Sequence, residues 1–381
     1  MKKVAFLLSV LFILLGLSCP ASAEDLVHDV KAAMLVELST GKVIYEQNAD
    51  EQLYIASVTK IMTMLIAMEK IDSGELSLDD TVTGSKKAKN TNGSSIYVNE
   101  GEKLTVDDLL KAMAIKSAND SCVVMAEHIA GDTDKFVAMM NSRAKELGMN
   151  NTVFVNCNGL DDNIDISQAH STARDVSIMA QELVKHRKIF DYSTTINDSL
   201  RNGTFPLEST NKQFLTNYQG ATGLKTGYTS KAGYCLCATA NRDGLEFLTV
   251  VLGANTKDAR FTATKTLLDY GYDNYILDRI AEAGEKVGTV NVSWGEANSV
   301  TAKAAEDHIV LRKKTGEPEI KKSVKMEEKL RAPVKEGDKL GEITFTQGGK
   351  TIKTIDILAG ETVERKGFFR ILLDILKMLF M

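Results

Sequence analysis

Three short motifs stand in one order along this 381-residue chain, and together they constrain its fold more than any other feature. They are Ser57-x-x-Lys60, Ser117-x-Asn119 and Lys225-Thr226-Gly227. A fold that brings them together supplies a nucleophile, two proton-transfer groups and a cation for a carboxylate. Each motif alone is weak, because further copies begin at Ser39, Ser142, Ser209 and Lys314. The surrounding sequence must therefore select among the copies.

The context of Ser57 favours it as the nucleophile. The run 61–68 that follows it is apolar nearly all round, which predicts a buried helix. A serine at a helix start lies near free backbone N–H groups, and Lys60, three residues on, shares its helix face. By contrast, Ser39 lies in a turn between two predicted strands, and Ser142 lies in a charged surface helix.

The two Lys-Thr-Gly copies separate in the same way. Lys314 lies in a charged stretch that ends in turn residues, whereas Lys225 is followed by strand-like segments at 234–240 and 245–252. An inner strand of an antiparallel sheet can line a cleft, and Gly227 would let a ligand approach the backbone there. We therefore take Lys225 as the functional copy.

The pattern of elements predicts an α+β fold. Two strands near 32–48, helices at 105–130 and from 172, antiparallel strands over 223–254 and a helix at 261–272 indicate one antiparallel sheet carrying a helical insertion. From about residue 276 short strands with turn residues between them predict a smaller all-β domain. We expect a catalytic domain over 24–275 and a β-rich domain over 276–366.

Both ends of the chain have the composition of targeting segments. Residues 1–23 combine Lys2-Lys3, an apolar core and Ala21-Ser22-Ala23, which is typical of a secretory signal peptide. Residues 367–381 are apolar except for a stripe of charges at 370, 374 and 377. This helix is too short to cross a bilayer, so we expect an interfacial membrane anchor; the alternative is a helix docked on the protein's own core.

Composition excludes several functions. The net charge is −5 and no basic tract is interleaved with aromatics, so no nucleic-acid partner is expected. No metal-ligand spacing occurs, so neither a metal nor another cofactor is implied. The cysteines after Cys19 are predicted to be buried free thiols, because Cys235 and Cys237 would point to one face of a strand without bonding each other.

The selected residues support acyl transfer. Ser57 needs a base to take its proton, and Lys60 can act only when neutral, a state that burial and the nearby cation Lys225 both favour. Ser117 is then placed to relay a proton to the leaving amine, and Asn119 to hold the substrate amide.

The remaining groups would bind the substrate. The oxyanion needs two donors, for which the backbone N–H groups of Ser57 and Tyr228 are the natural pair. Lys225 and Thr226 would bind a carboxylate, with further charge from Arg260. This chemistry fits a peptide bond next to a free C-terminal carboxylate.

The three motifs match the boxes of penicillin-binding proteins and serine β-lactamases, and the chain most resembles the low-molecular-mass D-alanyl-D-alanine carboxypeptidases. The likeness extends through Ser171–Asp175, Thr210–Lys212 and Gly223–Thr229 to the β-rich domain and the amphipathic tail. One departure is Tyr228, where some relatives carry His.

The resemblance implies a penicillin-binding-protein fold and removal of the terminal D-alanine from peptidoglycan stem peptides through a Ser57 acyl-enzyme. It also implies acylation and inhibition by penicillin and other β-lactams. With the signal and the tail, it places the protein at the outer face of the cytoplasmic membrane.

Three alternatives remain from the sequence. A β-lactamase would share the motifs, but the one cluster that resembles its deacylating Glu–Asn pair, Glu208 to Asn211, has three-residue rather than four-residue spacing. A non-catalytic module that binds cell wall or β-lactams would also retain the pocket. A Ser-His-Asp triad is possible, although none of the five histidines falls in a motif.

Overall fold

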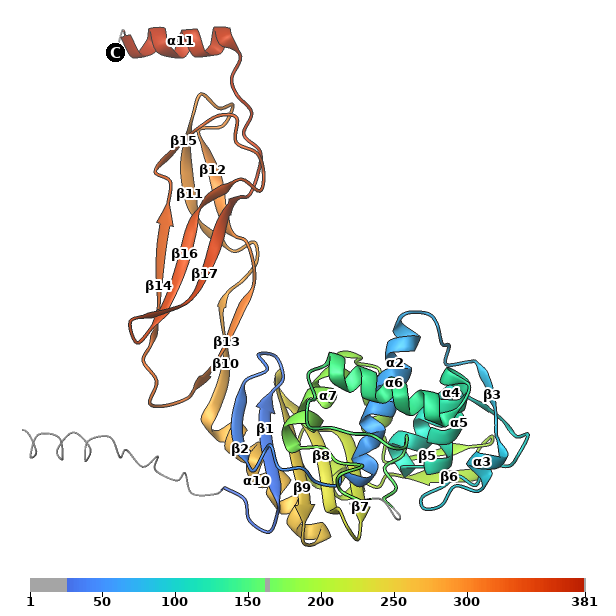
Figure 1. Cartoon of the computed structure of the whole chain (residues 1–381). Helices are drawn as coiled ribbons and strands as arrows, with labels where there is room; N and C mark the ends of the chain where they lie inside the picture. Colours follow the sequence, from blue (N-terminus) through green and yellow to red (C-terminus); the bar gives the residue numbers. More distant parts are fainter. Residues whose placement is uncertain (1–25, 162–164, 380–381) are drawn as a thin grey trace, which may run out of the picture.

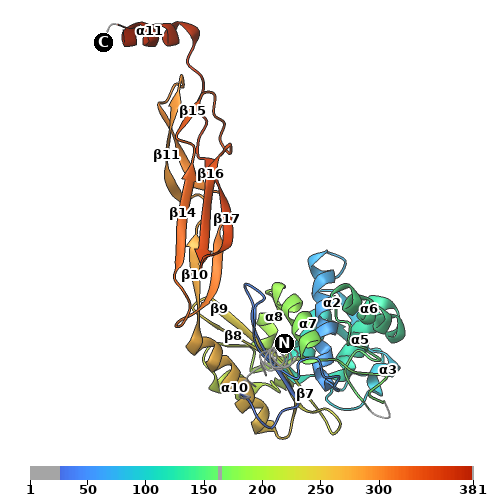
Figure 2. The ribbon, with the colours of Figure 1, turned by 60° about the vertical axis from the view of Figure 1, so that its left-hand side comes forward.

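The structure is a computed structural model and describes residues 26–161 and 165–379 (Figure 1). The predicted signal peptide, residues 1–23, lies outside the described residues. A broad mixed α/β body carries a narrow β module that stands away from it, and a helix, α11, lies at the far end of that module (Figures 1 and 2).

The body is built on a five-stranded antiparallel sheet in the order β2-β1-β9-β8-β7. The strands come from the two ends of the segment: β1 (Ala32–Glu37), β2 (Val43–Gln47), β7 (Ala221–Thr229), β8 (Gly233–Arg242) and β9 (Leu245–Ala254). The pairing of β1 with β9 closes the sheet across more than 200 residues of sequence. This arrangement confirms the predicted sheet with a helical insertion.

Both faces of this sheet are buried, because alternate side chains along each strand enter different cores. Met34, Cys237 and Val250 face the larger core, which the inserted helices cover. Leu35, Leu236 and Val251 face a second core under α10 (Lys257–Asn274). Cys235 and Cys237 are buried free thiols on the same face, as the sequence predicts.

The helical insertion lies between β2 and β7. Its central helix is α2 (Lys60–Asp72), in which residues 60–68 are consecutively buried, as the apolar run predicts. The other elements are η1 (Ala56–Thr59), β3 (Thr81–Thr83), α3 (Lys86–Lys89), β4 (Lys103–Thr105), α4 (Val106–Lys111), η2 (Ala112–Lys116), α5 (Asn119–Ala130), α6 (Thr133–Glu146), α7 (Ala173–Lys185), α8 (Ile189–Ser193), β5 (Asn197–Leu200), β6 (Phe205–Glu208) and α9 (Lys212–Asn217).

The β module follows α10. The antiparallel pair β10 (Tyr275–Ala281) and β13 (His308–Lys313) connects it to the body, and a six-stranded sheet in the order β14-β16-β17-β12-β11-β15 forms the rest. Those strands are β11 (Lys286–Ser293), β12 (Ser299–Ala304), β14 (Ile320–Met326), β15 (Lys329–Arg331), β16 (Lys339–Gln347) and β17 (Lys350–Ala359). A hairpin turn at Gly348-Gly349, where the sequence has turn residues, joins β16 to β17.

The sequence predicts strands of this module at 287–292, 309–311, 339–345 and 351–358, so β10, β12, β14 and β15 are not among them. Strand β14 is the one whose residues give least sign of a strand. Its central residues are exposed and three of them are lysines, so it has no apolar alternation to reveal it. It forms through backbone pairing with β16 along its whole length, an interaction that side-chain pattern does not encode.

Helix α11 (Phe368–Leu379) ends the described chain. Its described apolar side chains lie in solvent rather than in a core: Phe368 and Phe369 are 74% and 79% exposed, and Leu373 is 57% exposed. Among the described residues, no helix combines the length and the apolar character that crossing a bilayer requires.

Candidate active site

Ser57 and Lys60 lie where the 3₁₀ turn η1 runs into α2. The Nζ atom of Lys60 is 2.9 Å from the Oγ atom of Ser57. The short turn keeps both side chains on one face, so the candidate nucleophile and the candidate base are in hydrogen-bond contact before any substrate binds.

The amine of Lys60 is fully buried. It also donates hydrogen bonds to Oδ1 of Asn119 and to the backbone carbonyl of Asn158, each at 2.7 Å. Carbonyl oxygens only accept, so these two contacts take the two hydrogens of a neutral amine and leave its lone pair toward Ser57. Burial disfavours the charged form and lowers the pKa of Lys60. Both observations suit a proton acceptor.

The second motif lies in the turn between η2 and α5. Ser117 adopts a left-handed conformation with φ at 63°, which ends the helical run and places its side chain at the cleft. Asn119 begins α5, and its Nδ2 atom donates to the backbone carbonyl of Asn92 at 2.7 Å. Both ends of the Asn119 amide are thus engaged within the protein. The Oδ1 atom therefore holds Lys60, while the second hydrogen of Nδ2 remains for the expected contact with the substrate amide in the cleft that Asn119 lines.

The third motif lies on β7 directly against η1. A Cβ atom at Gly227 would lie 2.8 Å from the carbonyl oxygen of Ile55 and 3.2 Å from the backbone nitrogen of Ser57. Glycine therefore permits an approach that a side chain would block. Thr226 Oγ1 donates to Thr210 Oγ1 at 2.7 Å, and both threonines line the cleft.

Lys225 lies behind the cleft. It is 1% exposed, and its Nζ atom donates to the carbonyl of Thr226 at 2.9 Å. Burial, followed by repulsion from Lys60, holds the pKa of Lys225 well below its usual range. Two buried amines close together cannot both stay charged at low cost, so their titrations are linked.

Arg260, from the first turns of α10, lines the cleft although it is only 4% exposed. Its Nη1 atom donates to the carbonyls of Gly227 and Cys235 at 3.2 and 3.1 Å, which fixes the ends of β7 and β8. Burial lowers the pKa of Arg260 to about 10, so it remains a cation at neutral pH. Tyr228 lies at the rim, 56% exposed and 4.3 Å from the ring of Tyr234.

Two residues of the loop before Asp161 complete the site, and sequence reasoning did not select them. Asn158 supplies the carbonyl that binds Lys60. Gly159 has φ at 85°, and a Cβ atom there would lie 1.9 Å from the carbonyl oxygen of Ala56, so only glycine fits against η1. The dipeptide Asn158-Gly159 predicts a turn, but its sequence does not indicate that the Asn158 carbonyl contacts Lys60.

The copy that begins at Ser209 lies beside the cleft through Thr210, but the hydroxyl of Ser209 accepts from the N–H of Asn211 rather than meeting a lysine. The other competing copies lie elsewhere and have other partners. Ser39 Oγ donates to Glu37, Ser142 contacts Glu146 on the surface of α6, and Lys314 Nζ donates to the carbonyl of Tyr272. The described part of the chain holds no group of three or more His, Cys, Asp or Glu side chains that could ligate a metal ion.

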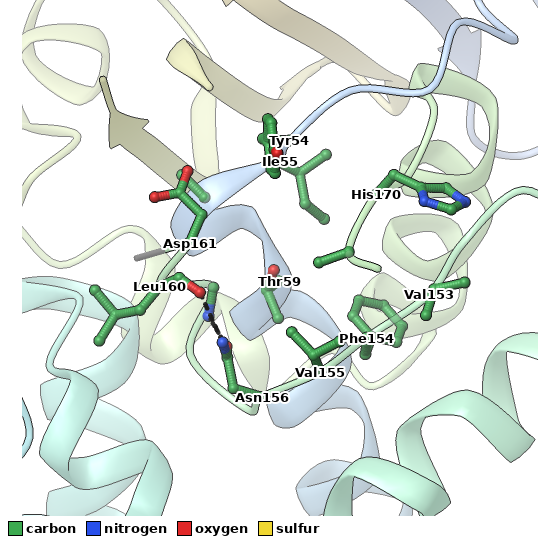
Figure 3. A pocket seen from close by; sticks show the side chains of 13 residues that line it. Tyr54, Ile55, Thr59, Val153, Phe154, Val155, Asn156, Leu160, Asp161 and His170 are labelled. Atoms are coloured by element: carbon green, nitrogen blue, oxygen red, sulfur yellow. Dashed lines mark hydrogen bonds between the residues drawn. The ribbon is translucent and has the colours of Figure 1, made fainter. Parts of the chain in front are cut away.

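A second pocket adjoins the cleft and shares Gly159 and Leu160 with it (Figure 3). His170 lines this pocket rather than the cleft, and its Nδ1 atom lies 2.7 Å from the carbonyl of Ile166. No histidine occurs among the described residues that line the cleft itself. The lysine-based set therefore explains the geometry, and a Ser-His-Asp triad does not.

Comparison with known proteins agrees with this geometry. The sequence profile described as "D-alanyl-D-alanine carboxypeptidase" matches residues 20–256, which is more than half of the chain. The chain belongs to this family. A second profile, "Penicillin-binding protein 5, C-terminal domain", matches residues 275–365. The predicted family, fold class and enzyme class, a serine-type D-Ala-D-Ala carboxypeptidase, are confirmed.

Individual relatives cover most of the carboxypeptidase chain. The D-alanyl-D-alanine carboxypeptidase DacF of Bacillus subtilis is 38% identical over 92% of this chain and 90% of its own length. Penicillin-binding protein 5 of Haemophilus influenzae has a similar structure, with a TM-score of 0.70 and 27% identity over 88% of this chain and 98% of that one. Penicillin-binding protein D2 of Listeria monocytogenes, solved with ampicillin bound, is 35% identical over 65% of this chain and 99% of its own, with a TM-score of 0.59.

Proposed function

We propose that Ser57 is the nucleophile with which this carboxypeptidase removes the terminal D-alanine from peptidoglycan stem peptides. The observation that carries the proposal is the 2.9 Å contact between Ser57 Oγ and the buried amine of Lys60. Lys60 takes the hydroxyl proton while Oγ attacks the carbonyl carbon of the penultimate D-alanine. The C–N bond then breaks, the terminal D-alanine leaves with a proton relayed by Ser117, and water hydrolyses the ester.

The groups on β7 and α10 are assigned to binding. The backbone N–H groups of Ser57 and Tyr228 are the proposed oxyanion donors, supported by the close approach of Gly227 to the Ser57 nitrogen. The hydroxyl of Thr226 and the charge of Arg260 would receive the substrate carboxylate at the cleft wall. Lys225, which lies behind the cleft wall, would support carboxylate binding through its hydrogen bond to the Thr226 carbonyl and through its charge when protonated. Asn119 would position Lys60.

Penicillin offers a direct test of the nucleophile. We expect incubation with penicillin to add one penicilloyl group, and we expect digestion and mass spectrometry to place it on Ser57. An adduct on any other residue would contradict the site assignment.

The time course of that adduct tests the β-lactamase alternative. The described residues that line the cleft include no carboxylate to hold a deacylating water, and Glu208 is instead paired with Lys212 at 2.5 Å. Release of the penicilloyl group should therefore be slow. Turnover faster than about one per second, ordinary for an enzyme, would favour a β-lactamase.

The finer statements on location are also proposals. We infer a signal peptide over 1–23, a catalytic domain over 24–275, a β-rich domain over 276–366 and a membrane-anchoring helix over 367–381 at the outer face of the cytoplasmic membrane. The exposure of Phe368, Phe369 and Leu373 supports the anchor over a helix docked on the protein's core, because that apolar surface has no partner among the described residues.

Deletion of residues 367–381 tests the anchor. We expect the truncated, signal-cleaved protein to move from the membrane fraction to the soluble fraction, because it loses the apolar surface that binds lipid. Replacing exposed Leu372 and Leu373 by Glu in the full-length protein should have the same effect without shortening the chain. Membrane association that persists in both variants would contradict the anchor.

A further inference from the structure

The end of the β module that lies farthest from the body carries the single tryptophan of the chain, Trp294. This residue directly follows β11, and its side chain is 39% exposed. Its φ is 60°, a conformation that bulky residues rarely adopt. The carbonyl of Trp294 accepts a hydrogen bond from the N–H of Lys366 at 2.8 Å, which holds the turn in place. A large ring kept at the surface in an unfavourable backbone conformation indicates a function.

Two arginines flank this ring. The guanidinium carbon of Arg331 lies 3.8 Å from the ring centroid, and that of Arg365 lies 5.6 Å from it. The backbone fixes both: Arg331 pairs with Ser293 between β15 and β11, and Arg365 forms a bridge with Gly295. Both residues are exposed, and neither forms an ion pair with an acidic side chain in the described part of the chain. Their N–H donors are available to an anion, and a guanidinium binds phosphate, like carboxylate, through two parallel hydrogen bonds.

The same end of the module meets α11. Arg365 lies three residues before Phe368, the first residue of that helix. Arg370 of α11 donates to Glu296 at 2.6 Å, which ties the helix to the turn after Trp294 and neutralises the nearby carboxylate. Figures 1 and 2 both place α11 beyond the end of the module that carries β15. If α11 lies in a membrane surface, the cluster of Trp294, Arg331 and Arg365 faces the same surface.

We propose that Trp294, Arg331 and Arg365 form a binding site for the phosphate groups of anionic phospholipids, which docks the tip of the β module on the membrane. The proposal rests on the membrane role assigned to α11. Tryptophan favours the level of the lipid headgroups, because its ring is apolar and its N–H is polar. Arginine contributes both charge and bidentate hydrogen bonds to phosphate. A second contact beside α11 would fix the orientation of the module, which a single surface helix leaves free.

Because Trp294 is the only tryptophan, its fluorescence reports on this site alone. The test uses the full-length mature protein with vesicles of phosphatidylglycerol, of phosphatidylcholine, and of brominated phosphatidylglycerol. We expect the emission of Trp294 to shift to shorter wavelength on phosphatidylglycerol and to be quenched by the brominated lipid. The effect should be weaker on phosphatidylcholine, which carries no net negative charge.

A double variant, Arg331→Gln with Arg365→Gln, tests the charge. We expect about 30-fold weaker binding to phosphatidylglycerol vesicles, the contribution of two arginines near an anionic surface. The control is Lys321→Gln with Lys322→Gln, which removes the same number of charges from β14. Lys322 pairs with Glu285 at 3.7 Å and lines a pocket with Asp278 and Arg312, at the end of the module next to the body. The control should bind less than twofold more weakly. Retained D-alanine release shows that each variant is folded.

The outcomes separate this inference from the anchor. If the protein sediments with the vesicles but the emission of Trp294 stays unchanged, α11 binds lipid and the tip does not, so the inference is overturned. An equal loss of affinity in the arginine and lysine variants would also overturn it, since charge alone would then explain binding. If the protein does not bind the vesicles at all, the anchoring role of α11 fails first and the inference fails with it.

Discussion

Replacing Ser57 by Ala should reduce D-alanine release by about 10⁶-fold, the scale on which serine enzymes lose activity when the nucleophile is removed. The reason is that the amine of Lys60 and the donors around the cleft have no covalent chemistry of their own. The measurement is the release of D-alanine from a peptide ending in D-Ala-D-Ala. The same variant should show no penicillin adduct.

The control for this experiment is Ser142→Ala. Ser142 belongs to another Ser-x-x-Lys copy but lies on the surface of α6, where its hydroxyl contacts Glu146. We expect the control to retain the wild-type rate. A Ser57→Ala protein that still released D-alanine at the wild-type rate would contradict the acyl-enzyme mechanism. If only binding of the peptide survived, the pocket would be intact and the loss would be chemical.

The second large effect concerns the protonation of Lys60. This amine accepts a proton only in its neutral form, and burial lowers its pKa in the folded protein. Acylation by penicillin should therefore fall as the pH drops through this lowered pKa, and it should reach a plateau above it. An exposed lysine would still be gaining activity near pH 10.4, at about its ordinary pKa. The measurement is the rate of adduct formation in a single turnover as a function of pH.

The variant Lys60→Arg keeps the positive charge but removes the base, because a guanidinium does not lose its proton at any of these pH values. We expect acylation to be slower by about 10²- to 10⁴-fold across the whole pH range, the usual contribution of a general base. The control is Lys70→Arg at the other end of α2, where the amine pairs with Glu75 on the surface. A wild-type rate that rose without a plateau into the ordinary lysine range would contradict a buried base.

The sequence predicts most of the catalytic body because its signals there are local and strong. The apolar run after Ser57 gives α2, and the strand-like segments at 234–240 and 245–252 give β8 and β9. Strand β14 is missed because its exposed lysines carry no periodicity, and its stability comes from backbone pairing with β16.

The residues that form the site are predicted about as well as the elements of the body. All the selected motif residues except Lys225 reach the cleft or the Lys60 amine, and Lys225 lies just behind them.

The sequence by itself determined which residues are candidates for catalysis and binding. A helix start, an apolar run and an inner strand each have a local pattern, and these patterns separate Ser57 and Lys225 from the other copies of their motifs. Only the tertiary structure decided how those residues act. Lys60 binds Asn119 and the carbonyl of Asn158, which are 59 and 98 residues away, so the Oδ1 atom of Asn119 holds the candidate base while its side chain also lines the cleft. The same holds for the cluster of Trp294, Arg331 and Arg365, which strand pairing and a β-bridge assemble from three separate segments. Contacts of this kind depend on how the chain folds back on itself, and no local pattern of residue types records them.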